Sequence, residues 1–125
     1  MIAYTTLGTN DLARSAAFYD ALLGDLGAKR AMEIDRVILW AAGAGQPLFA
    51  VAEPADGAPA TVGNGTMVAL SASDPAMVDK LHAKALALGA QDDGAPGPRT
   101  NQGLKFYAGY FRDPDGNKLN FFCLQ

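Results

Sequence analysis

The chain has 125 residues, half of them hydrophobic, with ten Lys and Arg against thirteen Asp and Glu and a net charge of −3. This length suits one compact domain, and the absence of a basic stripe argues against a nucleic acid partner. No apolar run is long enough to cross a membrane. The single cysteine, Cys123, allows no internal disulfide, and we expect it to be a small buried hydrophobe. Because the N-terminus has no signal-peptide pattern, we expect a cytoplasmic protein.

The first half of the chain reads as a strand, a helix and three further strands. Residues Ile2 to Thr9 are rich in β-branched and aromatic side chains, which favours a strand. Asn10 and Asp11 are expected to supply the N-cap and an acidic first turn of a helix, which Gly27 closes. The strand-like runs that follow are Ala28 to Ile34, Arg36 to Ala41 and Pro47 to Ala52.

The second half repeats this order after a small, turn-prone segment. Residues 53–65, EPADGAPATVGNG, are typical of a linker, which predicts modules of about 1–54 and 65–125 joined by a linker of about 55–64. We expect a strand over Thr66 to Ala72, an N-cap at Ser73, and a helix that Asp74-Pro75 open and Gly89 closes. A loop over residues 94–103 and strands Leu104 to Arg112 and Lys118 to Leu124 complete the chain.

The two halves align at a spacing of 63 residues. YTTLGTND (4–11) then matches MVALSASD (67–74), so that Leu7 meets Leu70 and Asp11 meets Asp74. The shared order of strand, cap, helix, glycine and strands is stronger evidence than these identities. The sequence therefore predicts an α+β fold made of two βαβββ modules.

The segment FRDPDGNKLNFF (111–122) predicts a turn between two strands. Asp113 begins a type I turn, Pro114 presets φ at the second position, and Gly116 is free to take a positive φ. We therefore interpret Asp113 and Asp115 as turn residues and expect one of them to pair with Arg112.

Three segments together resemble the glyoxalase, bleomycin-resistance and extradiol-dioxygenase superfamily, also called vicinal oxygen chelate proteins. They are TLGTNDLARSAAFYDALLGDLG near the start, GAPGPR in the second half, and FRDPDGNKLNFF near the end. The resemblance covers essentially the whole chain. It implies two βαβββ modules whose strands form a curled, concave mixed sheet with the helices outside, a ligand or metal in the cup, and commonly a homodimer. The modules can pair within one chain or swap between two chains.

In metal-dependent members of this family, His or Glu side chains on the first and last strands of each module hold the metal. Here Tyr4 and Met67 stand where histidines are expected, Asn120 stands where the last glutamate is expected, and Phe49 or its neighbours offer no ligand. Glu53 precedes Pro54 and is expected at the rim. A phenol, a thioether and an amide are poor ligands for a divalent metal, so we predict no metal and no cofactor.

The only histidine of the chain, His82, lies in the second predicted helix. Because it lies one step off the stripe of Val78, Leu81, Ala85 and Leu88, we expect a solvated or rim histidine that binds no metal. A single histidine also leaves no partner for a histidine-based acid–base pair.

Without a metal, the cup becomes an amphipathic pocket. Tyr4 and Met67 are expected near its floor, Asn120 supplies a donor and an acceptor, and Phe49 and Trp40 form walls. On the strand FYAGYFR, alternation places Phe106, Ala108 and Tyr110 on one face and Tyr107, Gly109 and Phe111 on the other, and one of these sets should line the cup. Each of these aromatic side chains can equally belong to the core.

The loop predicted over residues 94–103 is the irregular segment most suited to function. Arg99, Asn101 and Lys105 are expected to reach over the pocket mouth. Arg99 either binds a carboxylate or phosphate of a ligand, or forms a salt bridge with Asp92, Asp93 or Asp113.

Three hypotheses for function follow. The first is metal-independent binding of a small-molecule ligand in the cup. The second is a lyase, isomerase or dioxygenase-like enzyme that recruits a metal through other ligands, or uses Tyr4 as proton donor or oxyanion stabiliser while Asn120 orients the substrate. The third is a structural or regulatory dimer with a vestigial cup.

Overall fold

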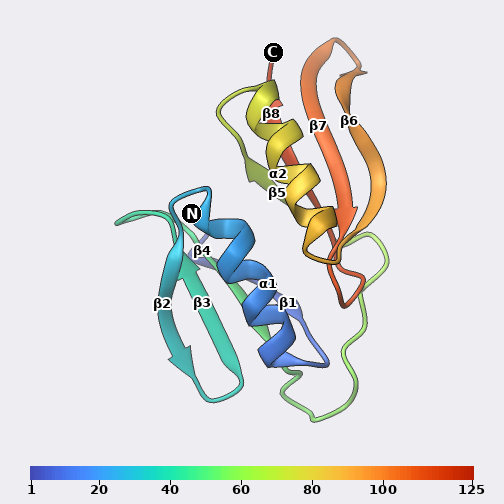
Figure 1. Ribbon diagram of the computed structural model, residues 1–125. Helices are drawn as coiled ribbons and strands as arrows, with labels where there is room; N and C mark the ends of the chain where they lie inside the picture. Colours follow the sequence, from blue (N-terminus) through green and yellow to red (C-terminus); the bar gives the residue numbers. More distant parts are fainter. The chain divides into compact units, whose positions relative to one another are not determined.

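The computed structural model describes all residues, 1–125, and divides the chain into two compact units, Met1–Gly63 and Asn64–Gln125. Each unit contains one helix and one four-stranded sheet (Figure 1). The elements of unit 1 are β1 (Tyr4–Gly8), α1 (Leu12–Gly24), β2 (Lys29–Ile34), β3 (Val37–Ala41) and β4 (Leu48–Ala52). The elements of unit 2 are β5 (Val68–Ser71), α2 (Pro75–Ala87), β6 (Gln91–Asn101), β7 (Leu104–Arg112) and β8 (Lys118–Leu124).

Both sheets have the same topology. Their strand orders are β1-β4-β3-β2 and β5-β8-β7-β6. In each, the first strand runs parallel to the last strand, and the other neighbours are antiparallel. The two helices are 13 residues long each and begin 63 residues apart, at Leu12 and Pro75. The predicted α+β fold of two βαβββ modules is confirmed, with one separate mixed sheet in each unit.

The helix caps lie one residue later than predicted. Asp11 is the N-cap of α1 and accepts a hydrogen bond from the backbone N of Arg14 at 3.0 Å, so the predicted cap Asn10 is wrong. Asp74 is the N-cap of α2 and accepts from the backbone N of Met77 at 2.8 Å, so the predicted cap Ser73 is wrong. A carboxylate satisfies an N-terminal N–H group as well as a hydroxyl or amide does, and both aspartates complement the positive end of the helix.

The amide of Asn10 instead fixes the segment after β4. Its Oδ1 accepts from the backbone N of Ala60 at 2.6 Å, and its Nδ2 donates to Ala60 O at 3.3 Å. The amide of Asn10 thus pairs with both the N–H and the C=O of Ala60, as the backbone of a neighbouring strand would. Gly8 leaves room for this approach, because a Cβ there would lie 3.0 Å from Ala60 Cβ.

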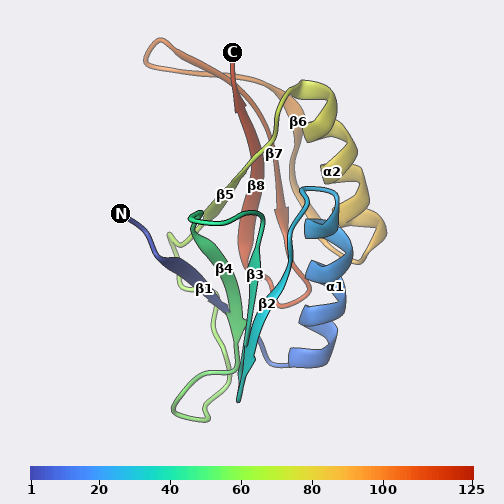
Figure 2. The same cartoon turned by 90° about the vertical axis from the view of Figure 1, so that its left-hand side faces the viewer.

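In unit 1, α1 packs on one face of its sheet (Figure 2). The Tyr19 ring of α1 lies 4.7 Å from the ring of Phe49 and 5.9 Å from that of Trp40. Trp40 Nε1 donates to Asp20 Oδ1 at 2.9 Å, and Arg30 binds both oxygens of Asp20 at 2.9 and 2.7 Å. The hydrogen bonds from Arg30 and, to a lesser extent, Trp40 hold the pKa of Asp20 below its usual value, although burial opposes the shift.

In unit 2, α2 packs through four residues that recur at helical spacing: Val78, Leu81, His82 and Ala85. The prediction of a solvated or rim His82 is wrong, since the side chain is only 4% exposed and lies on this buried stripe. Its Nε2 lies 3.0 Å from Tyr110 O and 3.1 Å from Asp92 Oδ1. Because both partners are acceptors, this ring nitrogen carries the hydrogen.

The segment predicted as a loop over residues 94–103 belongs mostly to β6, so that prediction is wrong. β6 pairs only with β7 and is therefore an edge strand, where Pro96 and Pro98 can be accommodated. Register shifts between Asp92 and Gly94 and between Gly94 and Gly97 mark irregular pairing. The hairpin turns through Gln102 and Gly103, whose φ angles of 48° and 87° are typical of a type I′ turn.

The turn before β8 is confirmed as a structural feature. Asp113 is 3% exposed and accepts from the backbone N of Asp115 and Asn117, both at 2.9 Å, and from Asn117 Nδ2 at 3.0 Å. Arg112 does not pair with these aspartates as predicted. It donates to Asp93 Oδ2 at 3.0 Å, because Asp93 lies beside it on the neighbouring strand β6, and to Gly116 O at 3.2 Å. Cys123 is buried, as predicted.

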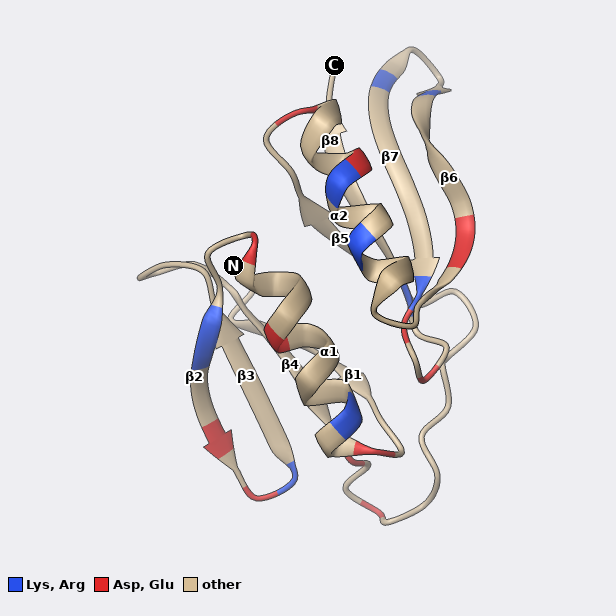
Figure 3. Ribbon diagram, viewed as in Figure 1, with Lys and Arg blue, Asp and Glu red and all other residues tan.

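Lys and Arg residues are interspersed with Asp and Glu residues along each unit (Figure 3). None of the helices has both the length and the apolar character that a membrane crossing requires.

Candidate functional site

Each sheet has one face covered by its helix and a second, helix-free face. In unit 1, Tyr4 pairs with Leu48 and Thr5 pairs with Phe49, so Tyr4 and Phe49 lie on opposite faces. Trp40 pairs with Phe49 and shares its face. Trp40 and Phe49 were predicted as pocket walls, but they pack against α1 and are only 1% and 8% exposed. They belong to the core, because their side chains lie on the face of the sheet opposite to that of Tyr4, which is the face that α1 covers.

The helix-free face of unit 1 contains a cavity of about 370 Å³. Most of its lining is apolar, and two charged residues of the β2–β3 turn also line it. The lining residues are Tyr4, Met32, Ile34, Asp35, Arg36, Val37, Leu39 and Leu48. Tyr4 and Ile34 are both 57% exposed, so the cavity is accessible from solvent. Of these residues, sequence reasoning singled out only Tyr4; the alternation of Val37 and Leu39 along β3 is the signal that could have found others.

The strand β7 of unit 2 places Tyr110, Ala108 and Phe106 on the helix-free face. Tyr107 alternates with them and lies on the helix side, where its hydroxyl donates to Asp79 Oδ1 of α2 at 2.7 Å. This bond to an acceptor carboxylate raises the pKa of Tyr107. The prediction of Tyr107 as a ligand-binding residue of the cup is therefore wrong, since its hydroxyl is engaged on the other face.

Asn120 lies opposite Tyr110 in the antiparallel pair of β8 and β7. It is 2% exposed, and its Oδ1 is buried without a hydrogen-bond partner. The Tyr110 ring has two cations near it: the guanidinium carbon of Arg99 at 5.6 Å and Lys118 Nζ at 5.4 Å from its centroid. Arg99 forms none of the three predicted salt bridges, and its Nη2 donates to Ala95 O at 2.7 Å. Lys118 is a residue of this site that sequence reasoning missed.

The other two predicted residues of unit 2 lie differently. Met67 precedes β5 and is 42% exposed. Asn101 ends β6 and pairs with Leu104, six residues along β7 from Tyr110, which is about 20 Å at the rise of a strand. The structure therefore does not bring Asn101 together with Tyr110 and Asn120.

The family resemblance implies a divalent metal, and the residues at its positions do not fit one. Tyr4, Met67 and Asn120 offer a phenol, a thioether and an amide, whereas such metals prefer imidazole and carboxylate. No group of three or more His, Cys, Asp and Glu side chains is placed to hold a metal ion. The one histidine, His82, directs its Nε2 to Tyr110 O and Asp92.

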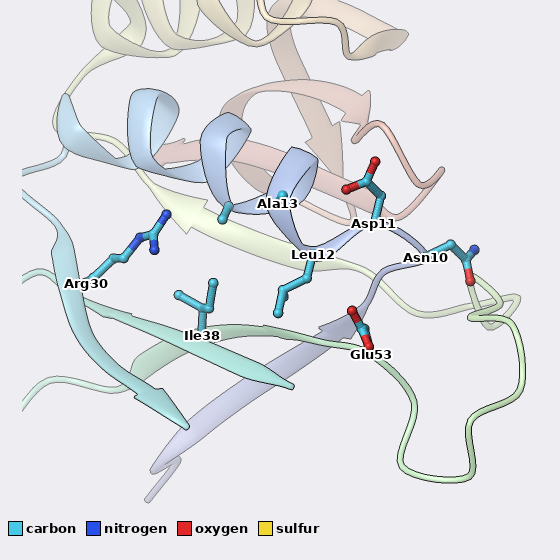
Figure 4. A pocket seen from close by; sticks show the side chains of 8 residues that line it. Asn10, Asp11, Leu12, Ala13, Arg30, Ile38 and Glu53 are labelled. Atoms are coloured by element: carbon cyan, nitrogen blue, oxygen red, sulfur yellow. The ribbon is translucent and has the colours of Figure 1, made fainter. Parts of the chain in front are cut away.

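A second cavity, of about 700 Å³, lies on the helix side of unit 1 (Figure 4). Its polar residues already hold the fold together. Asp11 caps α1, Asn10 binds Ala60, and Arg30 binds Asp20 and Glu33. Glu53, predicted at the rim of the cup, lines this cavity instead (Figure 4).

The duplicated βαβββ topology and the helix-free sheet faces define a protein of the vicinal oxygen chelate class. The family model for the Glyoxalase/Bleomycin resistance protein/Dioxygenase superfamily matches residues 1–121, and the chain belongs to this family. Comparison with curated protein sequences gives no match.

Solved structures support the same assignment. A glyoxalase/bleomycin resistance protein from Albidiferax ferrireducens T118 is 36% identical, with a TM-score of 0.89 and 98% of both chains covered. A hypothetical protein from S. aureus is 26% identical, with a TM-score of 0.71, covering 98% of this chain and 91% of the other. The lactoylglutathione lyase from Agrobacterium tumefaciens is similar in fold, at 21% identity and a TM-score of 0.68, covering 98% and 92%.

Proposed function

We propose that this protein binds a small, largely apolar organic molecule on its helix-free sheet faces and that it does so without a divalent metal. The observation that carries the proposal is the cavity of about 370 Å³ beside Tyr4. Its volume falls in the range of about 300–1,000 Å³ that is usual for small-molecule sites. Its lining of Met32, Ile34 and neighbouring aliphatic side chains suits an apolar ligand.

The metal-independent part of the proposal rests on donor chemistry. Tyr4 and Met67 cannot offer the imidazole nitrogens that a divalent metal prefers, and the Asn120 amide is a weak neutral ligand. The ligand then gains most of its affinity from apolar contact.

The test is titration with N-phenyl-1-naphthylamine, a neutral apolar dye whose fluorescence rises when it leaves water. We expect saturable binding, and we expect Ile34→Gln to weaken it about five-fold or more by placing an amide in the cavity. Ile2→Gln is the matched control, because Ile2 is 53% exposed and does not line the cavity. The absence of saturable binding, or equal affinities of the Ile34→Gln and Ile2→Gln variants, would contradict the proposal.

Elemental analysis of protein purified without chelators tests the metal-independent part. We expect no stoichiometric metal and unchanged dye binding after dialysis against EDTA. A stoichiometric ion that is lost in the Asn120→Ala variant would overturn this part.

We further propose that the protein is a homodimer, as family members commonly are. The support is the exposed apolar side chains that do not line the cavity, with Leu104 at 52% and Leu124 at 66% exposure. Light scattering during size-exclusion chromatography tests this proposal, and the mass of a single chain would refute it.

A further inference from the structure

Two positively charged side chains lie beside the ring of Tyr110 in an otherwise acidic protein. Arg99 and Lys118 both lie within 6 Å of its centroid, although the whole chain carries a charge of −3. Each cation is attracted to the ring, but the two like charges repel each other. Arg99 belongs to β6 and Lys118 to β8, the two strands that flank β7, so both neighbours of the Tyr110 strand direct a cation to its ring. An anionic partner beside the ring would offset this charge.

The protein itself neutralises these cations only in part. The single carboxylate near Lys118 Nζ is Asp93, at 3.7 Å, and Arg112 Nε binds the same oxygen of Asp93 at 3.0 Å. Arg99 forms no ion pair, and its Nη2 is bound to the neutral carbonyl of Ala95. Its Nε is buried without any partner. A guanidinium in this state has unused capacity for an oxyanion.

Asn120 provides a second, independent observation at the same place. As the cross-strand partner of Tyr110, its side chain starts about 5 Å from that of Tyr110. Its Oδ1 is buried and has no donor, which is unfavourable unless another molecule supplies one. A metal cation is a poor candidate, because Arg99 and Lys118 would repel it. An N–H or O–H group of a ligand is the complementary choice.

We propose that the helix-free face of unit 2 binds an organic acid: its carboxylate or phosphate binds Arg99 and Lys118 beside Tyr110, and an N–H or O–H of the same molecule donates to Asn120 Oδ1. This inference rests on the proposed small-molecule function and names the class of ligand. The oxyanion takes the place of Asp93 at Lys118, and the apolar part of the acid contacts the Tyr110 ring.

The test uses N-benzoylglycine, two derivatives that each change one of its groups, and a phosphate ester that keeps only its phenyl ring. N-benzoylglycine carries a carboxylate and an N–H, its primary amide lacks the charge, its N-methyl derivative lacks the N–H, and phenyl phosphate replaces the carboxylate. Backbone NMR titrations of the whole chain follow β6, β7 and β8. We expect N-benzoylglycine to bind about five-fold more tightly than its primary amide, as one exposed ion pair would give, and this preference to fall with added salt.

Variants assign the preference to the named cations. Arg99→Gln and Lys118→Gln should each reduce the preference for the acid, and neither should affect folding greatly, because Lys118 is 34% exposed at its side chain and Arg99 lies on the edge strand. Lys80→Gln is the matched control, since Lys80 belongs to the outer helix α2. Asn120→Ala should abolish the difference between N-benzoylglycine and its N-methyl derivative. If that buried variant does not fold, the Arg99 and Lys118 variants still decide the question.

The outcomes separate this inference from the proposed function. Equal binding of the acid and its primary amide, or a preference that survives in both the Arg99→Gln and Lys118→Gln variants, overturns the inference. The proposed function stands in that case if N-phenyl-1-naphthylamine still binds saturably. Tighter binding of phenyl phosphate, which lacks the N–H, than of N-benzoylglycine supports the cationic part of the site and identifies phosphate as the preferred oxyanion.

Discussion

Replacing Gly109 by alanine is expected to destabilise unit 2 by about 1–3 kcal/mol, the usual cost of overpacking a core. A Cβ on Gly109 would lie 2.9 Å from Pro96 Cγ and 3.0 Å from His82 Cδ2, both well inside normal contact distance. The φ angle of Gly109 is not positive, so the backbone accepts alanine and the cost is steric. Pro96 can shift outward with the edge strand, whereas His82 is held by Tyr110 O and is buried.

Urea unfolding followed by far-UV circular dichroism measures this cost, and amide exchange along β7 places it in unit 2. Gly97→Ala is the matched control, because Gly97 lies on the neighbouring strand β6 and no atom lies within 4 Å of its Cβ position. We expect the control to change the free energy of unfolding by less than about 0.5 kcal/mol, or to raise it slightly. Equal stabilities of the Gly109→Ala and Gly97→Ala variants would refute the steric argument.

Three further predictions concern hydrogen-bonded side chains. Hydrogen bonds, the strongest of them from Arg30, lower the pKa of Asp20 in the folded protein. The ionised Asp20 therefore stabilises the fold above about pH 4, and this stabilisation is lost as the pH falls through the folded-state pKa. Thermal unfolding against pH should show that Asp20→Asn costs less than about 1 kcal/mol at pH 7 and nothing in acid. The hydrogen bond to Asp79 raises the pKa of the Tyr107 hydroxyl. The difference in unfolding free energy between the wild type and Tyr107→Phe should therefore be constant below about pH 10 and disappear as the pH rises further. A stability difference that grows with pH would contradict this prediction. Asp113→Ala should cost about 2–3 kcal/mol in urea unfolding because it leaves buried N–H groups of the turn without an acceptor, and a neutral effect would show that the turn does not need that carboxylate.

The repeat, the order of elements and the turn at Asp113 could be predicted because each depends on local residue type. The face of the sheet on which each side chain lies could not be predicted as well, because it depends on how neighbouring strands are paired in register. Tyr4 and Phe49 both read as inward residues, yet Tyr4 pairs with Leu48, which sends Phe49 to the opposite face. A shift of one residue in pairing reverses every such assignment.

Two other errors come from residues whose usual preference was overridden by their position. Pro96 and Pro98 indicate a loop, but an edge strand tolerates them because only one side of β6 needs hydrogen-bond donors. His82 reads as polar and outward, but it sits four residues after Val78 on the buried stripe and finds acceptors in Tyr110 O and Asp92. Neither acceptor is near His82 in the sequence, so no local signal predicts the pairing.

The buried thiol of Cys123 in β8 can report how often unit 2 opens in the unmodified protein. Its thiol is the only one present and is 7% exposed, so a thiol-reactive reagent can modify it only when β8 opens. The speed of modification therefore counts the opening events of unit 2 in the unaltered protein. Trp40, the sole tryptophan, is buried in unit 1, so its fluorescence reports the unfolding of that unit separately. Comparing the rate of thiol modification with the rate of fluorescence change shows whether the two units unfold together or one after the other.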